Sequence, residues 1–312
     1  MKKCSIKKII WIIITVVVTL FLIQKTGHLL DPFEAEDGLN AIDAFHKLED
    51  NSIEALVFGS SRAWKGCDTS VMNDEYGIKA YNYSCNWQAI NTTLLFIRDS
   101  FRTQSPDVIF VETGHVGKVL EDTDLNGEIY YTRRIPLFDG KIEYLRECFG
   151  NNIERYASYY FPLIMFHDNW TQIDFENFYS PGTQRYLNAY GYNEDCNDYL
   201  EPITIPSIKD TNQADLPQSS INTLDKIVEE CEEKGVKLVF YTIPCADGYA
   251  YSEAMKQFAE SRSVEYINFY EYSDDSGLSG KTDYQDGVHL NREGAKKVAV
   301  YLSEFIIGKQ NK

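Results

Sequence analysis

The sequence predicts an α/β fold in which a parallel sheet of about five strands is covered by helices on both faces. Short apolar runs of strand length alternate along the chain with longer segments whose apolar residues recur at helical spacing. The runs are nearly continuous in their apolar character, which is typical of parallel strands buried on both faces. We therefore expect a three-layer α/β/α sandwich, and in such sheets the binding crevice lies at the carboxyl ends of the strands.

An apolar segment precedes this domain. Four lysines among the first eight residues come before Ile9–Ile23, a run without charge. The run is slightly shorter than the ~20 residues of a spanning helix, but flanking lysines can extend it by snorkelling. A cleaved signal peptide is the alternative, although no small-residue cleavage site follows. We expect residues 1–30 to be a cytoplasmic tip and the single transmembrane anchor of a cell-membrane protein. The positive N-terminal flank places the N-terminus in the cytoplasm and residues 31–312 outside.

The first half of the extracytoplasmic domain should contain three strands. A linker and an amphipathic helix come first, and a helix with apolar residues at Ile90, Leu94, Ile97 and Phe101 separates the second strand from the third. The first strand feeds a tight turn of small residues. The expected elements are, in order, a helix at 39–50, a strand and turn at 52–61, a strand at 78–84, a helix at 88–103 and a strand at 106–114.

The alternating pattern stops between about residues 118 and 214. This segment holds half of the chain's 22 tyrosines. We expect a large aromatic insertion after the third strand, placed to cap the crevice. Its tyrosines could stack on sugar rings or simply pack against one another, and the sequence leaves both open.

Two more strands follow the insertion. A helix with a serine N-cap and a stop at Gly235 leads into the fourth strand, and the chain closes with a helix. The expected elements are a helix at 219–235, a strand at 236–244, a helix at 252–262, a strand at 264–270 and a helix at 291–307.

Charge and cysteine content exclude some functions. A formal net charge of −17 argues against a nucleic-acid partner, because no basic field exists to collect phosphates. The cysteines show no metal-ligand spacing, so we expect no metal site and no cofactor. Disulfides and free buried thiols are both open for an extracellular domain of this size. The seven cysteines are Cys4, Cys67, Cys85, Cys148, Cys196, Cys231 and Cys245.

Three residues could form a serine nucleophile with its base. Ser61 lies at the turn after the first strand, where a hydroxyl is exposed and following amides can face an oxyanion. A serine hydroxyl is a poor nucleophile until a base takes its proton, and that base needs a third group to fix its tautomer. Asp286 and His289 are three apart in a tight turn and can point to one side. The sequence therefore predicts a catalytic set of Ser61, His289 and Asp286.

This order of residues resembles the SGNH/GDSL hydrolase superfamily, in which a first-strand serine is followed by a late Asp-x-x-His before the final helix. The stretch "FGSSRA" stands where the family has its first block, with Ser60 at the usual aspartate, and "DGVHLNREG" is similar to the last block. The resemblance covers about residues 52–115 and 216–307. It implies a flavodoxin-like sheet and gives Ser61, Asp286 and His289 their triad roles.

The resemblance also implies an oxyanion hole, and the middle blocks depart from the family. Asn82 in "YNYSCNWQ" fits the second block, but the family's glycine is missing. The expected donors are the amides of Ser61 and of Cys85 or Asn86. The third block normally supplies an asparagine, and this chain has "VETGHVG" instead.

Neighbouring residues are candidates for substrate binding. We expect Gly114 and His115, in the altered third block, to line the site. Arg62 follows the nucleophile and could hold an anionic acceptor, or it could form a salt bridge with the insertion.

The departures and the anchor look like the membrane-anchored branch of the superfamily in bacteria, which includes teichoic-acid D-alanine transfer and alginate O-acetylation proteins. This implies a serine esterase or O-acyltransferase that acts on a cell-surface glycan or acylated polymer through an acyl-serine. A membrane-bound O-acyltransferase is the implied partner. The alternative is a catalytically weak binding or scaffold protein of the cell envelope.

Overall fold

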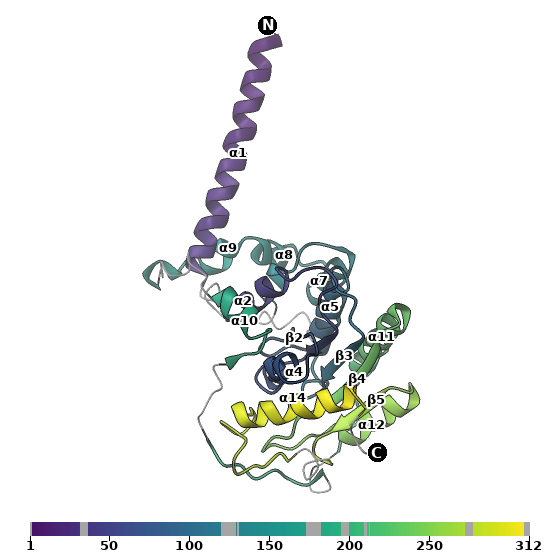
Figure 1. Ribbon diagram of the computed structural model, residues 1–312. Helices are drawn as coiled ribbons and strands as arrows, with labels where there is room; N and C mark the ends of the chain where they lie inside the picture. Colours follow the sequence, from purple (N-terminus) through teal and green to yellow (C-terminus); the bar gives the residue numbers. More distant parts are fainter. Residues whose placement is uncertain are drawn as a thin grey trace.

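The computed structural model describes residues 2–31, 37–119, 129, 131–172, 182–194, 200–208, 211, 213–271 and 277–308. A long helix, α1, stands clear of an α/β domain, and the chain's two ends lie far apart (Figure 1). The elements before the insertion are α1 (Lys2–Leu30), α2 (Asp37–Phe45), β1 (Ala55–Phe58), α3 (Ser61–Trp64), α4 (Thr69–Asp74), β2 (Ala80–Asn82), α5 (Ile90–Ser100) and β3 (Val108–Glu112).

The remaining elements belong to the insertion and to the second half of the domain. The insertion contains η1 (Thr132–Arg134), α7 (Asp139–Phe149), α8 (Ile153–Tyr160), α9 (Pro162–Phe166), η2 (Asn169–Gln172) and α10 (Gly182–Asn188). After it come α11 (Gln218–Lys234), β4 (Lys237–Thr242), α12 (Ser252–Ser261), β5 (Glu265–Asn268) and α14 (Arg292–Ile306).

The five strands form one sheet in the order β2-β1-β3-β4-β5, and every pair is parallel. This is the flavodoxin-like order, so the predicted α/β class and strand number are confirmed. The order reverses between β1 and β3, whose paired residues include Val57 and Phe110. A crevice forms beyond the carboxyl ends of the strands at such a reversal. The sheet therefore places the segments after β1 and β3 side by side.

The two faces of the sheet carry separate apolar cores, because alternate side chains of a strand point to opposite faces. Leu56 and Phe58 of β1 belong to a core with α5, α11 and α12. Val57 packs on the other face with α4 and α14. These are the two helical layers of the predicted sandwich.

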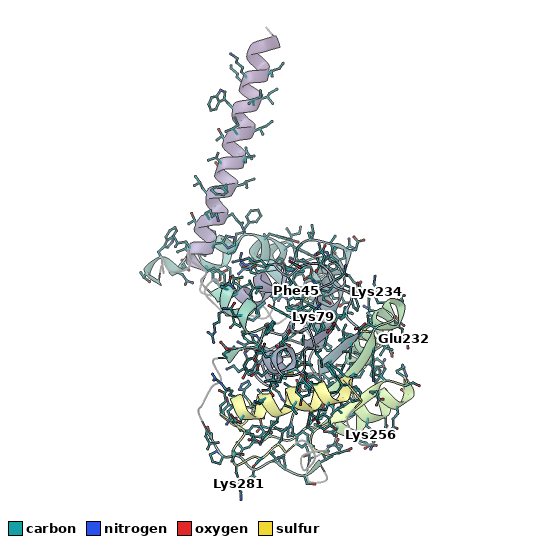
Figure 2. The ribbon with its side chains drawn as sticks, in the orientation of Figure 1. Phe45, Lys79, Glu232, Lys234, Lys256 and Lys281 are labelled. Atoms are coloured by element: carbon teal, nitrogen blue, oxygen red, sulfur yellow. The ribbon has the colours of Figure 1, made fainter. Side chains whose placement is uncertain are left out.

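Helix α1 is long and apolar enough to cross a membrane. Ile6–Leu30 has a mean hydropathy of 2.5, and an 18-residue stretch of it has no buried residue, whereas Leu30 at its end is 2% exposed. Its side chains project outward without neighbours along most of its length (Figure 2). Only the last turns contact the domain, where α1 packs against α9. A single N-terminal spanning helix, as predicted, is compatible with these features.

The insertion packs beside the sandwich. Helix α7 lies against α5, and α10 lies against α2. The segment after α10 contacts the end of β2 and the end of α3. There the Tyr190 carbonyl accepts from the Asn82 amide at 2.9 Å, and the Gly191 carbonyl accepts from the Trp64 indole at 3.0 Å. Residues 120–128 and 173–181 of the insertion lie outside the described residues, so a cap over the crevice stays a prediction.

Five cysteines are buried and lie outside disulfides in the part of the chain described here: Cys67, Cys85, Cys148, Cys231 and Cys245. Each is enclosed by packed side chains, so the domain is held by its core at these positions and not by cross-links. Of the two possibilities left by the sequence, these five residues follow the second, that of buried thiols. The side chains of Cys4 and Cys196 lie outside the described residues.

Gly59 connects β1 to the turn that follows. Its φ is +153°, and an added Cβ would lie 2.8 Å from the Cβ atoms of both Ala63 and Glu112. Contacts this short force backbone or neighbouring atoms to move. Only glycine lets the end of β1 approach α3 and β3 this closely.

We expect Gly59→Ala to lower the free energy of unfolding by about 3 kcal/mol, from overpacking added to an unfavourable φ. Gly77→Ala is the matched control, because Gly77 has a φ of +67° but nothing within 4 Å of its missing Cβ. That substitution should cost about 1 kcal/mol. Denaturant unfolding of the full chain in detergent measures both, and equal losses would contradict the packing argument.

Candidate active site

Ser61 is the first residue of helix α3, directly after the turn that ends β1. The hydroxyl of Ser60 caps this helix by accepting from the Arg62 amide at 3.3 Å. Serine is a favoured N-cap because its oxygen satisfies an amide that the helix leaves unpaired. Ser61 is half-buried, whereas Ser60 is only 1% exposed. The Ser60 side chain therefore points into the protein, and the Ser61 side chain faces the crevice.

Asp286 and His289 lie in the loop before α14. One carboxylate oxygen of Asp286, Oδ1, accepts from the amides of Val288 and His289 at 2.8 and 2.7 Å. The other, Oδ2, is 2.8 Å from Nδ1 of the His289 ring. One carboxylate thus closes the turn and fixes the ring orientation, which explains why a spacing of three residues suits this pair.

The structure brings Ser61, His289 and Asp286 together. Nε2 of His289 is 2.8 Å from Oγ of Ser61, across 228 residues of sequence. With Nδ1 facing a carboxylate, the neutral ring keeps its proton on Nδ1 and leaves Nε2 as an acceptor. The hydroxyl of Ser61 then donates to Nε2, which is the arrangement that activates a serine.

The charges around His289 keep its ring neutral. Burial lowers the pKa of His289, Asp286 raises it, and the cations Lys65 and Arg62 lower it again. The net pKa lies below the ordinary value of 6.5, so the ring is unprotonated at neutral pH. Burial alone would raise the pKa of Asp286, but its hydrogen bonds from His289 and Val288 bring it below the usual range. Asp286 is therefore ionised and His289 is ready to accept a proton.

Arg62, a substrate-binding candidate from the sequence, points into the protein. Its side chain is 5% exposed, its Nε lies 3.7 Å from Oε1 of Glu112, and its Nη2 donates to the Ile243 carbonyl. Burial is the largest influence and would lower the pKa of Arg62, but Glu112, together with Cys245, Tyr270 and Tyr249, raises the pKa above its ordinary value. The guanidinium is thus a buried, permanently charged ion-pair partner and is not placed to hold an anionic acceptor. Its salt bridge is to β3, not to the insertion.

Gly114 and His115 follow β3 beside this ion pair. A Cβ on Gly114 would lie 2.5 Å from Nη1 of Arg62, so only glycine fits above the guanidinium. Burial, with Arg62, Lys118 and His289 nearby, lowers the pKa of His115 to about 4. His115 is therefore neutral at neutral pH, and it is close enough to His289 for a charge on that ring to lower its pKa. Its ring stacks with that of Trp87, with 6.1 Å between the ring centroids. The structure places Gly114 and His115 at the edge of the site.

The expected oxyanion donors differ in their surroundings. The amide of Cys85 already donates to Oε1 of Gln88 at 3.1 Å and to the Gly59 carbonyl at 3.4 Å. It is therefore bonded within the protein and not directed at a ligand. The amide of Ser61 is at the first position of a helix, where no intrahelical acceptor exists. Asn86 is half-exposed and precedes Trp87, which has a φ of +58°.

Sequence reasoning missed the roles of two residues. Glu112 appeared only as a departure from the family's third block, but its buried Oε1 accepts from the Gly114 amide at 2.9 Å as well as pairing with Arg62. Trp87 is 66% exposed next to the site. A tryptophan in the loop that follows a predicted strand is the sequence signal that could have identified it. Among the described residues, no group of three or more His, Cys, Asp or Glu side chains could hold a metal ion.

Comparisons with known proteins find similarity to solved structures alone. A scan of protein-family models and a search of curated proteins find no match. Three similar solved structures are a protein described as an acylhydrolase from Bacteroides fragilis and GDSL-like lipases from Bacteroides thetaiotaomicron and Parabacteroides merdae. Their sequence identities are 11%, 10% and 11%, and their TM-scores are 0.41, 0.40 and 0.37. They cover 86%, 89% and 84% of this chain, and 94%, 100% and 99% of their own length.

The three solved structures are described by name alone as an acylhydrolase and as lipases. Two of the three carry the name of the superfamily that the first and last sequence blocks resemble. All three TM-scores are below 0.5, so the assignment of the site rests on the distances within this chain.

We expect the rate at which a fluorophosphonate labels Ser61 to rise with pH as His289 loses its proton, with a midpoint below pH 6.5. Asp286→Asn should move the midpoint lower still, since Asp286 raises the pKa of His289. It should also slow labelling by up to about 10⁴-fold. Replacing His167, which is 59% exposed, with alanine is the control and should leave the profile unchanged. A midpoint above 6.5 would contradict the electrostatic argument.

Proposed function

We propose that this protein is a membrane-anchored serine acyl esterase or O-acyltransferase that acts on an acylated cell-surface glycan or teichoic-acid-like polymer outside the bacterial membrane. The observation that carries the proposal is the pair of 2.8 Å contacts linking Ser61 Oγ to His289 Nε2 and His289 Nδ1 to Asp286 Oδ2. Such a chain of contacts turns a hydroxyl into a nucleophile for acyl carbonyls.

The first half of the reaction forms an acyl-serine. His289 Nε2 takes the proton of Ser61 as Oγ attacks the acyl carbonyl carbon, and the carbonyl oxygen becomes an oxyanion. Asp286 stabilises the imidazolium that forms. The amide of Ser61 and an amide near Asn86 are the proposed oxyanion donors, each worth about 10²–10³ in rate. When the tetrahedral intermediate collapses, the leaving alcohol takes the proton from His289, and the acyl group stays on Ser61.

The second half releases the acyl group. His289 removes a proton from an acceptor hydroxyl, which attacks the acyl-serine, and Ser61 leaves with the proton that His289 returns. Water as acceptor gives an esterase, and a sugar hydroxyl gives a transferase. The exposed indole of Trp87 beside the site offers an apolar, ring-sized surface of the kind that sugar rings stack on. This surface supports a glycan as acyl donor or acceptor.

Arg62 is not placed to bind an anion on the substrate. This guanidinium, the nearest to Ser61 in sequence, is paired with Glu112. A phosphate or uronate on the acceptor would therefore have to be bound by other residues. Lys65, whose positive charge acts on His289, is a candidate.

Ser61→Ala should abolish labelling by a fluorophosphonate and reduce hydrolysis of an activated acetate ester by at least about 10⁴-fold, because no other group replaces the nucleophile. Ser60→Ala is the matched control: it removes the neighbouring hydroxyl, whose bond is only the cap to the Arg62 amide. It should keep the labelling while lowering stability by about 1 kcal/mol. An unlabelled, folded wild-type protein that still binds glycan would favour the binding or scaffold alternative.

Hydrolysis and transfer can be separated on the same protein. The acyl group should leave labelled Ser61 faster when a glycan acceptor is added, and mass spectrometry should find it on the glycan, if transfer is the reaction. An esterase would release free acid at a rate that the glycan does not raise.

A further inference from the structure

With α1 placed across a bilayer as proposed, its last turn lies where the bilayer meets water. The apolar helix Ile6–Leu30 has 25 residues. At 1.5 Å per residue it is about 37 Å long, about 7 Å more than a hydrocarbon core of ~30 Å. Lys25, which lies over the Phe21 ring at 5.8 Å, can reach the headgroups from the edge of the core. The turn after Lys25 therefore falls in the headgroup layer.

Helix α9 packs on α1 at this level. A Cβ on Gly27 would lie 2.6 Å from the backbone nitrogen of Leu163, so the two backbones are in direct contact. The side-chain amide of Asn169 donates to the Leu30 carbonyl at 3.2 Å. The side chain of Asp31 is fully buried against the Arg133 guanidinium. The first two contacts hold α9 and η2 at a fixed height on α1, and the third joins the end of α1 to η1. Figure 1 shows α8 and α9 along the edge of the domain from which α1 rises.

The same short segment carries exposed apolar side chains. Ile164 and Met165 on α9 are 47% and 37% exposed, and Trp170 on η2 is 56% exposed. Leu163 and Phe166 are less exposed and point toward the domain. The outward residues are therefore Ile164, Met165 and Trp170, which we call the α9–η2 face. Between them, His167 and Asp168 form an exposed polar pair. Tryptophan beside aliphatic residues with a polar turn is the composition that favours a membrane–water interface.

We propose that the α9–η2 face docks on the outer surface of the same bilayer that α1 spans, with Trp170 at headgroup level. The inference rests on the proposed membrane anchoring of α1. Docking adds a second attachment point next to the first, so the catalytic domain is held at one height and tilt above the lipid. A domain held in this way reaches acyl groups and glycans that lie close to the membrane in preference to distant polymer.

The test uses the full chain in vesicles of phosphatidylcholine and phosphatidylglycerol that contain brominated lipid. The chain has four tryptophans, so the emission of Trp170 is obtained as the difference between wild type and Trp170→Phe. The emission of Trp11, inside α1, is obtained in the same way from Trp11→Phe. We expect lipid with bromine near the glycerol end to quench Trp170 more strongly than lipid brominated near the chain ends.

A charged variant and its control sharpen the result. Ile164→Asp should remove the quenching of Trp170, because a carboxylate on this face opposes entry into the interface. Ile307→Asp introduces the same charge at a position of similar exposure, 42%, at the C-terminal end of α14, and should leave the quenching unchanged.

Three outcomes would overturn the proposal in distinguishable ways. Quenching of Trp11 without quenching of Trp170 refutes docking and leaves the anchor intact. Quenching of neither residue refutes the anchor, and with it the proposed location of the enzyme. The third outcome is that Trp170 is shielded from a water-soluble quencher in native membranes but not in vesicles of lipid alone. That result refutes docking on lipid and identifies a membrane protein as the partner of this face.

Discussion

The carboxylate of Glu112 joins the carboxyl ends of three strands. Its Oε1 accepts from the amides of Gly114 and Ile243 at 2.9 and 3.5 Å and faces Arg62 at 3.7 Å. Burial raises the pKa of Glu112, and Arg62 and the two amides oppose that rise. A buried pair of this kind adds little net stability, but losing one partner leaves an uncompensated charge. Because Arg62 follows Ser61 directly, the place of the nucleophile depends on this pair.

The same guanidinium also acts on the base. Its positive charge disfavours a second positive charge on His289, whereas Asp286 favours it. The opposing effects separate two tasks: Asp286 fixes the ring and favours its protonated form, whereas burial, Lys65 and Arg62 together keep the resting ring neutral. A buried ion pair that orders the strand ends therefore also adjusts the proton affinity of the site. Gly114 has no side chain, so the Arg62 guanidinium can occupy the position from which it acts on both Glu112 and His289.

Much of the sandwich could be predicted from the sequence because its strands are buried on both faces and read as apolar runs. The part of the site that depends on residues close together in sequence could be predicted. The three-residue spacing of Asp286 and His289 is the example. The ion pair of Arg62 with Glu112 could not, because the register of β1 on β3 brings the two together. The bonded amide of Cys85 was equally hidden, since it depends on the side chain of Gln88 folding back.

The insertion was expected as a segment, but the helices inside it were not predicted, for a different reason. Helices α9 and α10 have only five and seven residues, too few for a helical period to be visible, and they pack on α1 and α2 and not on the sheet. Helix α3 has only four residues, too few for any periodicity to be visible.

The 228 residues between Ser61 and His289 have a consequence for how the protein is made. The first strand and the last loop supply the two halves of the site, and α14 must pack on α4 before that loop is held in place. At a synthesis rate of about 5–20 residues per second, the serine is made roughly 10–45 s before its base. Throughout that interval the growing chain carries Ser61 without the ring that would take its proton. The three residues can meet only after the loop before α14 has been made.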